Sequence, residues 1–479
     1  MDSKPDRPHA GIIAGSLIAS ALAFYFGTGL HPIWWLTWLA PLPLLLIAPR
    51  LSLWQAFASS LLASFIGGLN LWHYFRSVLE VPLAPTIIFM VLPACVFALG
   101  VLLFRRFALR GDLLKAAIVY PAFWVSYEFL TASISIHSTY GNLAYNQMNF
   151  LPILQIASIA GIWGISFCVM WFPAAIAALF VVPAQARQKK LLAVSVGIFF
   201  LAVLIFGEWR LRATKHAPLV TVALIASDLP ENYLPRTEED TLRLLQDYAA
   251  EGDALSAQHV QAIVLPEKIG VVREAYLSQT DSLLSDTAAR TGAVLVVGLI
   301  RRDSHGLWNE ARIYSPDGTA PLTYEKQHML PPFESQFTVG TSRALLHRPS
   351  GLWGVTICKD MDFPQLSRQY ALEGTGLLLV PAWDFDADGW LHGRMAVLRG
   401  VEDGFSIARA PRHGILSVSD DRGRILAESA TSSKPFVTLV AQVPAQHDST
   451  LYSRWGNWFA WLSVLLLFLS LFSTTKRRA

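Results

Sequence analysis

The stretch Leu352-Trp-Gly-Val-Thr-Ile-Cys-Lys-Asp360 ends a short apolar run with a cysteine and two charged residues. Such a run is typical of a buried strand. The cysteine, Cys358, would then stand at the end of a strand, where reactive groups can face a cleft. Cys95 and Cys168 lie inside apolar runs instead, where a cysteine is usually a small buried hydrophobe. A free thiol at position 358 is either buried and inert or used in catalysis.

Two charged residues precede this cysteine in the same polar part of the chain. Glu267 follows the apolar run 262–265, and Lys326 lies in Tyr324-Glu-Lys-Gln-His. A thiol, a carboxylate and an ammonium that converge on one cleft provide a nucleophile, its base and a group that stabilises an oxyanion. The three residues therefore predict acyl-transfer chemistry, with a surface acid, a solvated lysine and an inert thiol as the plainer alternatives.

The segment around these residues alternates apolar runs with amphipathic patterns, which predicts an α/β layered domain. Strands are expected at 219–225, 262–265, 293–300, 352–357, 376–381, 405–409, 414–419 and 435–441. Helices are expected at 238–255, with Thr237 as the N-cap residue, and at 274–291.

The composition indicates that the rest of the chain is membrane protein. Of 479 residues, 53% are hydrophobic and only 15% are charged, whereas soluble proteins carry about 25% charged residues. Stretches long enough to cross a bilayer are expected near 11–29, 33–49, 53–73, 82–104, 116–135, 152–183, 191–208 and 456–474. The predicted domains are a bundle of about seven helices over 1–215, an α/β domain over 216–452, and a last helix with a basic tail over 453–479.

Charge distribution predicts the orientation of these eight spans. Basic residues follow every second span, at Arg50, at 105–115, at 187–190 and at 476–478, while the opposite short loops carry almost none. The positive-inside rule then places both termini in the cytoplasm and the α/β domain outside. The first apolar run could alternatively be a cleaved signal peptide, which would leave seven spans and the same side for the domain.

Several partners are not expected. The net charge of +3 is too small to indicate a nucleic-acid partner. The sequence contains no HExxH motif, no Cys/His cluster and no CxxC pair, so neither a metal site nor a disulfide framework is predicted. No cofactor is expected.

The order and spacing of Glu267, Lys326 and Cys358 resemble the nitrilase superfamily, and the spans around the domain are similar to the bacterial apolipoprotein N-acyltransferase family. Further stretches resemble that family: Asn142-Leu-Ala-Tyr-Asn-Gln, Gly161-Ile-Trp-Gly-Ile-Ser-Phe, Lys326-Gln-His-Met-Leu-Pro-Pro-Phe-Glu and Thr450-Leu-Tyr-Ser-Arg-Trp-Gly-Asn-Trp. The resemblance implies an αββα sandwich. It also implies transfer of an acyl chain from a phospholipid to the N-terminal amine of a diacylated lipoprotein, by a monomer in the bacterial inner membrane.

The resemblance also assigns roles. Cys358 would form a thioester in a ping-pong reaction, Glu267 would act as base, and Lys326 would face the oxyanion. Glu334 would orient Lys326 or the substrate amine, with a plain salt bridge as the alternative. Asp360 either caps a helix that begins at Pro364 or pairs with the lysine.

Other residues have supporting roles under the same resemblance. His392 and Glu402 follow the family's later spacing. Phe333, Phe337 and Trp383 could be lid residues that contact acyl chains, with ordinary packing as the alternative.

Three stretches depart from the family's pattern. Lys359 follows the cysteine, and it either activates the thiolate or points outward. The outward direction is favoured, because neighbouring side chains at a strand end point opposite ways. The first domain strand runs into Ala226-Ser-Asp, and Pro381-Ala-Trp-Asp-Phe-Asp replaces a family stretch. These changes leave open a membrane-anchored nitrilase-type amidase, or an acyltransferase with another amine acceptor. An inactive scaffold is the third class considered.

Overall fold

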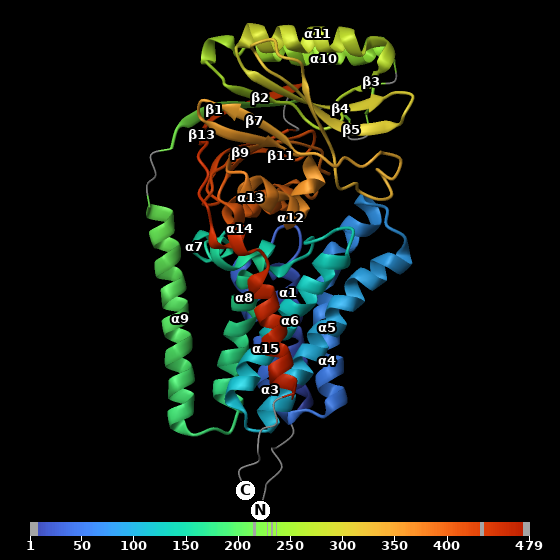
Figure 1. The fold of residues 1–479 in the computed structure, drawn as a ribbon. Coiled ribbons are helices and arrows are strands. Elements are labelled where there is room, and N and C mark those ends of the chain that lie inside the picture. The colour runs from blue at the N-terminus through green and yellow to red at the C-terminus, as the bar shows by residue number, and fades with distance from the viewer. Residues whose placement is uncertain are drawn as a thin grey trace, which may run out of the picture. The chain divides into compact units, whose positions relative to one another are not determined.

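The computed structural model describes residues 8–213, 217–227, 229–230, 233–235, 237–431 and 435–472 (Figure 1). The chain divides into two compact units. One contains Met1–Arg212 and Trp455–Ala479, and the other contains Ala213–Arg454.

The first unit is helical. Five of its described helices are long and apolar enough to cross a membrane: α1 (Ala10–Gly27), α5 (Leu83–Leu109), α6 (Leu113–Ile134), α8 (Ala157–Val181) and α9 (Ala186–Arg212). Shorter helices are α2 (Trp34–Leu39), α3 (Leu42–Ile47), α4 (Leu53–Gly68), α7 (Leu151–Leu154) and α15 (Trp458–Phe472). Single turns lie at Ala48–Arg50, Leu69–Leu71, Tyr74–Val78 and Leu143–Gln147. The predicted polytopic helical architecture is confirmed.

Two of the predicted spans do not form one regular helix. The run 33–49 forms α2 and α3 rather than one helix, because Pro41 and Pro43 lack the backbone N–H that a continuous helix needs. The run 53–73 forms the regular helix α4 as far as Gly68, and the residues after it continue in tighter and wider helical turns up to Val78. Gly67 packs directly against Phe24 of α1, where a side chain would not fit.

The predicted orientation depends partly on residues outside the described part of the chain. The basic tail residues 476–478 fall there, and so do Lys4 and Arg7, the basic residues that precede the first predicted span. Both the orientation and the domain boundaries therefore stay predictions.

The second unit contains two β-sheets. The first sheet has the order β13 (Phe436–Pro444), β1 (Leu219–Ser227), β2 (Ala262–Val264), β4 (Val294–Arg302), β5 (Leu307–Tyr314) and β6 (Leu322–Glu325), with β3 (Val271–Arg273) beside β4. The second has the order β12 (Ile425–Ala430), β11 (Ile415–Ser419), β10 (Ser406–Pro411), β9 (Thr375–Ala382), β8 (Gly351–Val355) and β7 (Ala344–Arg348). The centre of each sheet is parallel: β1, β2 and β4 in the first, and β8, β9 and β10 in the second.

Alternating side chains of each strand reach different cores. In β1, Val222 and Leu224 enter the core between the sheets, while Ile225 packs toward α10 (Glu238–Asp253) and α11 (Glu274–Thr291). In the second sheet, Leu377 and Leu379 of β9 face the same central core. Leu378 and Val380 pack toward α12 (Pro364–Leu372) and α13 (Gly389–Asp403).

Helices thus cover the outer face of each sheet, which confirms the αββα sandwich (Figure 1). Every predicted strand and both predicted helices form, with Thr237 accepting from the Asp240 N–H as the N-cap. Strands β3, β5, β6, β7 and β12, with helices α13 and α14 (Leu451–Trp455), were not predicted. Asp228 of the predicted Ala226-Ser-Asp stretch lies outside the described residues.

Candidate active site

Glu267 follows the parallel strand β2 and is 1% exposed. Its backbone N–H donates to the carbonyl of Ala382, at the end of β9 in the other sheet, at 3.1 Å. Its Oε1 accepts from Nδ2 of Asn309 at 2.6 Å and from Nζ of Lys326 at 2.8 Å. Its Oε2 is buried and has no hydrogen-bond partner among the described residues. One oxygen is therefore held in place, and the other is available to accept a proton.

Lys326 directly follows β6 and connects two buried acids. Its backbone N–H donates to the Asn309 carbonyl at 2.8 Å, and its Nζ donates to Oε2 of Glu334 at 2.7 Å as well as to Glu267. Glu334 also accepts from the N–H of Leu330 at 2.9 Å, from Asn309 at 3.0 Å and from Lys268 at 2.5 Å. Four donors occupy this carboxylate, so its geometry suits holding Lys326 better than receiving a proton.

The charges of this cluster stabilise one another. Burial alone would lower the pKa of Lys326, but the carboxylates of Glu267 and Glu334 raise it well above its usual value. Burial alone would raise the pKa of Glu334, yet Lys326 and Lys268 hold it well below its usual range. At neutral pH Lys326 is an ammonium and Glu334 is a carboxylate.

Cys358 follows β8 and begins a short helical turn, Cys358–Asp362. Its backbone is left-handed, with φ +44°, a conformation that costs a non-glycine residue about 1–2 kcal/mol. Its Sγ donates to the carbonyl of Trp383 at 3.5 Å. Burial raises the pKa of the Cys358 thiol far above its usual value, Glu267 raises it further, and Lys326 lowers it. The resting thiol is therefore protonated and requires a base when it attacks.

Asp360 connects the cysteine turn to the lysine loop, which is a different role from both predicted ones. Its Oδ2 accepts from the hydroxyl of Tyr324 at 2.7 Å and from the N–H of Ile357 at 3.2 Å. Its Oδ1 accepts from the N–H groups of Gln327 at 3.2 Å and His328 at 2.9 Å. The prediction that Asp360 caps α12 is wrong, because the N-cap residue of that helix is Phe363.

Lys359 points inward, so the prediction of an outward-pointing side chain is wrong. The residue is 5% exposed, and its Nζ lies 3.3 Å from Oδ2 of Asp362. Alternation along a strand does not extend to this position, because the left-handed backbone at Cys358 ends the extended conformation.

His392 and Glu402 both lie on α13 but in different surroundings. Nε2 of His392 is 3.2 Å from Oδ2 of Asp388. Burial would lower the pKa of His392, but Asp388 and the more distant Asp362 and Asp384 raise it to about 9.

Glu402 is fully buried beside Arg399, at 2.8 Å. Ten residues of helix separate it from His392, which corresponds to about 15 Å. Glu402 therefore belongs to a packing cluster near the end of α13, in which its carbonyl also accepts from Thr450.

The three aromatic residues predicted to contact substrate lie at differing depths. Phe333 is 48% exposed, with its ring centroid 6.0 Å from that of Phe385. Phe337 is 8% exposed, and its ring centroid lies 5.8 Å from Nζ of Lys268. Trp383 is half-buried, and its carbonyl accepts from Cys358. Of the three, Phe333 is the most accessible to a ligand.

Sequence reasoning missed several residues of the site. Asn309 donates to both Glu267 and Glu334, and Lys268 pairs with Glu334. Arg409 makes a buried two-point ion pair with Asp384, at 2.6 and 2.5 Å. Only the position of Lys268, directly after Glu267, was a signal in the sequence.

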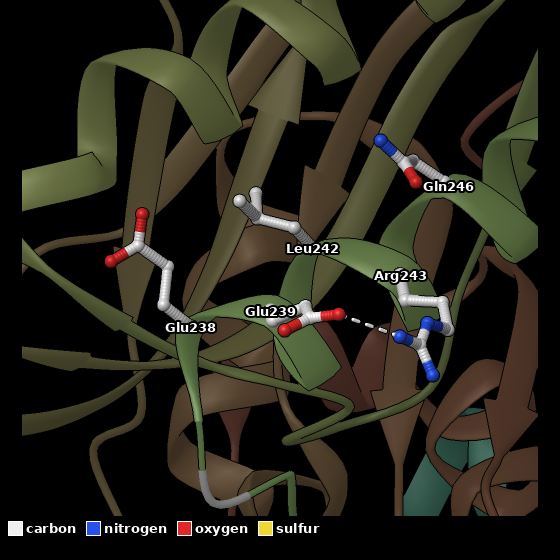
Figure 2. Close-up of a pocket in the computed structure, with 5 residues that line it drawn as sticks. All are labelled: Glu238, Glu239, Leu242, Arg243 and Gln246. Carbon is white, nitrogen blue, oxygen red and sulfur yellow. Dashed lines mark hydrogen bonds and ion pairs between the residues drawn. The ribbon is translucent and has the colours of Figure 1, made fainter.

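Figure 2 shows a surface pocket elsewhere in the same unit. It is lined by residues of the N-terminal part of α10: Glu238, Glu239, Leu242, Arg243 and Gln246. Arg243 pairs with Glu239 at 2.8 Å. None of the candidate site residues lines this pocket, and among the described residues no group of three His, Cys, Asp or Glu side chains could hold a metal ion.

Comparison with known proteins gives two family matches. Residues 15–175 match the apolipoprotein N-acyltransferase N-terminal domain, and residues 222–453 match carbon-nitrogen hydrolase. The apolipoprotein N-acyltransferase of Geobacter metallireducens is 25% identical, over 97% of this chain and 94% of that protein. The enzyme of the same name from Pasteurella multocida is 26% identical, over 93% and 92%. The crystal structure of Saccharomyces cerevisiae Nit3, a nitrilase-superfamily member, is 21% identical with a TM-score of 0.41, over 56% of this chain and 99% of that one.

Proposed function

The chain belongs to the apolipoprotein N-acyltransferase family, and we propose that it moves a fatty acyl chain from a phospholipid to the N-terminal amine of a diacylglyceryl-cysteine lipoprotein. One observation carries the chemistry. The carboxylate of Glu267 has one oxygen fixed by Lys326 and one unpartnered buried oxygen, and its charge acts on the thiol of Cys358.

The first half-reaction forms a thioester. Sγ of Cys358 attacks the carbonyl carbon of the phospholipid ester while Oε2 of Glu267 takes the thiol proton. Nζ of Lys326 faces the developing oxyanion, a role in which one donor contributes about 2.7–4 kcal/mol. The ester C–O bond then breaks, and the lysophospholipid leaves with the proton that Glu267 held.

The second half-reaction transfers the acyl group. The lipoprotein amine attacks the thioester carbonyl, and Glu267 takes a proton from the amine. The C–S bond breaks, the amide product leaves, and the proton returns to the sulfur of Cys358. Because the two substrates use the same cysteine in turn, the kinetics are ping-pong.

The setting of this chemistry is the bacterial inner membrane. Both termini lie in the cytoplasm and the sandwich lies on the extracytoplasmic side, as the basic residues after alternate spans support. A single chain carries the whole proposed site, because Glu267, Lys326, Glu334 and Cys358 all come from one chain, so a monomer suffices.

Intact-protein mass spectrometry tests this function. The purified full chain is incubated with phospholipid alone, and a mass gain of one acyl chain localised to Cys358 is expected. Addition of a diacylated lipopeptide should remove the acyl group and yield the N-acylated peptide. An unmodified Cys358 together with release of ammonia from small amides would instead identify an amidase.

A further inference from the structure

Two cations lie over the ring of Trp383, the residue whose carbonyl contacts the nucleophile. Nζ of Lys268 is 4.8 Å from the ring centroid, and Cζ of Arg412 is 4.4 Å from it. The Trp383 carbonyl accepts from Sγ of Cys358. Positive charge is therefore concentrated beside the point where a donor ester would be cleaved.

Arg412 is a buried guanidinium without an acidic partner. It is 1% exposed, and its side chain donates to the carbonyls of Lys268, at 3.5 Å, and Tyr233. No ion pair joins it to an acid in the part of the chain that the structure describes. Burial lowers the pKa of Arg412 to about 10, so it still carries its charge at neutral pH. Burying a charge without a counter-ion is costly, so a partner from outside the chain would stabilise this group.

Lys268 is the most accessible ion of the adjacent cluster. Its side chain is 13% exposed, whereas those of Glu267, Lys326 and Glu334 are 1–2% exposed. It pairs with Glu334 and lies 3.6 Å from Glu267. A ligand that approaches Trp383 would therefore meet Lys268 before the other charged groups of the cluster.

Arg412 is a cation beside Trp383 that has no carboxylate partner among the described residues. Lys268 and Lys326 pair with the carboxylates of Glu267 and Glu334. Arg409 pairs with Asp384. An anion is the complement of this arrangement. Lysine and arginine are the usual donors to phosphate oxygens.

We propose that Lys268 and Arg412 form a subsite for the headgroup phosphodiester of the acyl donor, and that this subsite makes the enzyme prefer anionic glycerophospholipids over zwitterionic ones. This inference rests on the proposed function. In phosphatidylglycerol the phosphodiester carries the only charge of the headgroup. In phosphatidylethanolamine an ammonium follows the phosphodiester and would be brought toward Lys268 and Arg412, where like charges repel.

The test compares two donors with identical acyl chains. The full-length protein in non-ionic detergent micelles is given phosphatidylglycerol or phosphatidylethanolamine, and mass spectrometry follows thioester formation at Cys358. The expected wild-type result is a lower apparent KM for phosphatidylglycerol. In Lys268→Met the preference should shrink, because the repulsion that disfavours the ammonium of phosphatidylethanolamine is lost. Loss of the charged hydrogen bond to the phosphodiester should in addition raise the apparent KM for both lipids by roughly ten- to hundred-fold. Lys268→Arg, which keeps the charge, should retain the preference.

Substitutions of Arg412 test the second cation, and a substitution of the remote Arg243 is the control. Arg412→Gln should lose the preference and Arg412→Lys should keep part of it; if Arg412→Gln does not fold, the two Lys268 variants decide. Arg243→Gln removes one positive charge from the α10 pocket (Figure 2) and should leave the donor ratio unchanged.

Two results would overturn the inference: equal use of both lipids by the wild type, or variants that slow both lipids equally. The second result would mean that Lys268 and Arg412 only hold the Trp383 side chain in place and do not select the headgroup. If no phospholipid acylates Cys358, the proposed function itself fails, and the inference fails with it.

Discussion

Nζ of Lys326 lies 2.8 Å from Oε1 of Glu267, and this contact leaves Oε2 of the same carboxylate buried without a partner among the described residues. The lysine thus fixes the carboxylate and occupies only one of its two oxygens. A buried polar atom without a partner is costly, so a hydrogen-bond donor that reaches Oε2 would be stabilising. In the proposed mechanism this carboxylate is a base that is oriented before substrate arrives.

Replacing this base should stop thioester formation while the fold remains. Glu267→Gln preserves the shape of the side chain but removes its proton-accepting oxygen, so acylation of Cys358 should slow by roughly 10²–10⁴-fold. Stopped-time mass spectrometry of the acylated protein measures the rate. Glu239→Gln, an exposed acid on α10, is the matched control. Unchanged acylation in Glu267→Gln would place the base elsewhere.

Alanine substitutions can distinguish the proposed nucleophile, Cys358, from the other cysteines. Cys358→Ala should abolish the acyl adduct, because no other sulfur lies beside Glu267 and Lys326 in the described structure. Cys95→Ala, in α5 of the other unit, should acquire the acyl chain like the wild type. Peptide mapping after incubation with phospholipid distinguishes the two. An adduct that persists in Cys358→Ala would contradict the proposed mechanism.

Lys326 should matter for both stability and rate. Lys326→Met removes the closer of the two cations that Glu267 contacts and leaves Lys268 beside both acids. Breaking a buried ion pair from one side costs about 3–5 kcal/mol. Loss of the oxyanion donor should also lower acylation by roughly 10²–10³-fold. Thermal unfolding in detergent and the acylation rate measure the two effects. A variant that keeps wild-type stability would show that the cluster is not coupled as the distances indicate.

His392 should make the folded protein more stable at low pH than at high pH. Its pKa of about 9 in the folded protein is above the ordinary value of about 6.5, so the folded state binds the proton more tightly. The resulting stabilisation, at most about 3 kcal/mol, is fully present below pH 6.5 and is lost as pH rises through 9.

His392→Gln should therefore unfold at lower temperature than the wild type at pH 6. The difference should disappear above pH 9, where His392 is neutral in the folded protein. Melting curves across this range, monitored by tryptophan fluorescence, provide the measurement. A constant difference at all pH values would show that His392 acts by packing rather than by its charge.

Strands that are buried on both faces were predictable, because they appear in the sequence as continuous apolar runs. All eight residues of β9 are buried, for example. Strand β5 was missed because its buried residues include the polar Asn309, Glu310 and Arg312. Arg312 hydrogen-bonds to Glu310, and Asn309 hydrogen-bonds to Glu267. Strand β12 was missed because it is a half-exposed edge strand with only alternating burial.

The site likewise contains residues that the sequence predicted and residues that it did not. The identities of Glu267, Lys326 and Cys358 came from the sequence, and the structure brings the first two into direct contact. The direction of Lys359 could not be predicted, because it depends on a left-handed backbone at the preceding residue. The role of Asn309 could not be predicted either, since it arises only when β5 lies beside β6.

The division of the site between the two sheets has a consequence for biogenesis. Glu267 and Lys326 follow strands of the first sheet, whereas Cys358 follows a strand of the second. A nascent chain that has formed only one sheet holds either the base or the nucleophile, never both. We therefore expect that partly folded intermediates cannot consume lipid, and that reactivity appears in one step when the sheets dock. An acyl label on Cys358 would then report completed folding of an individual molecule.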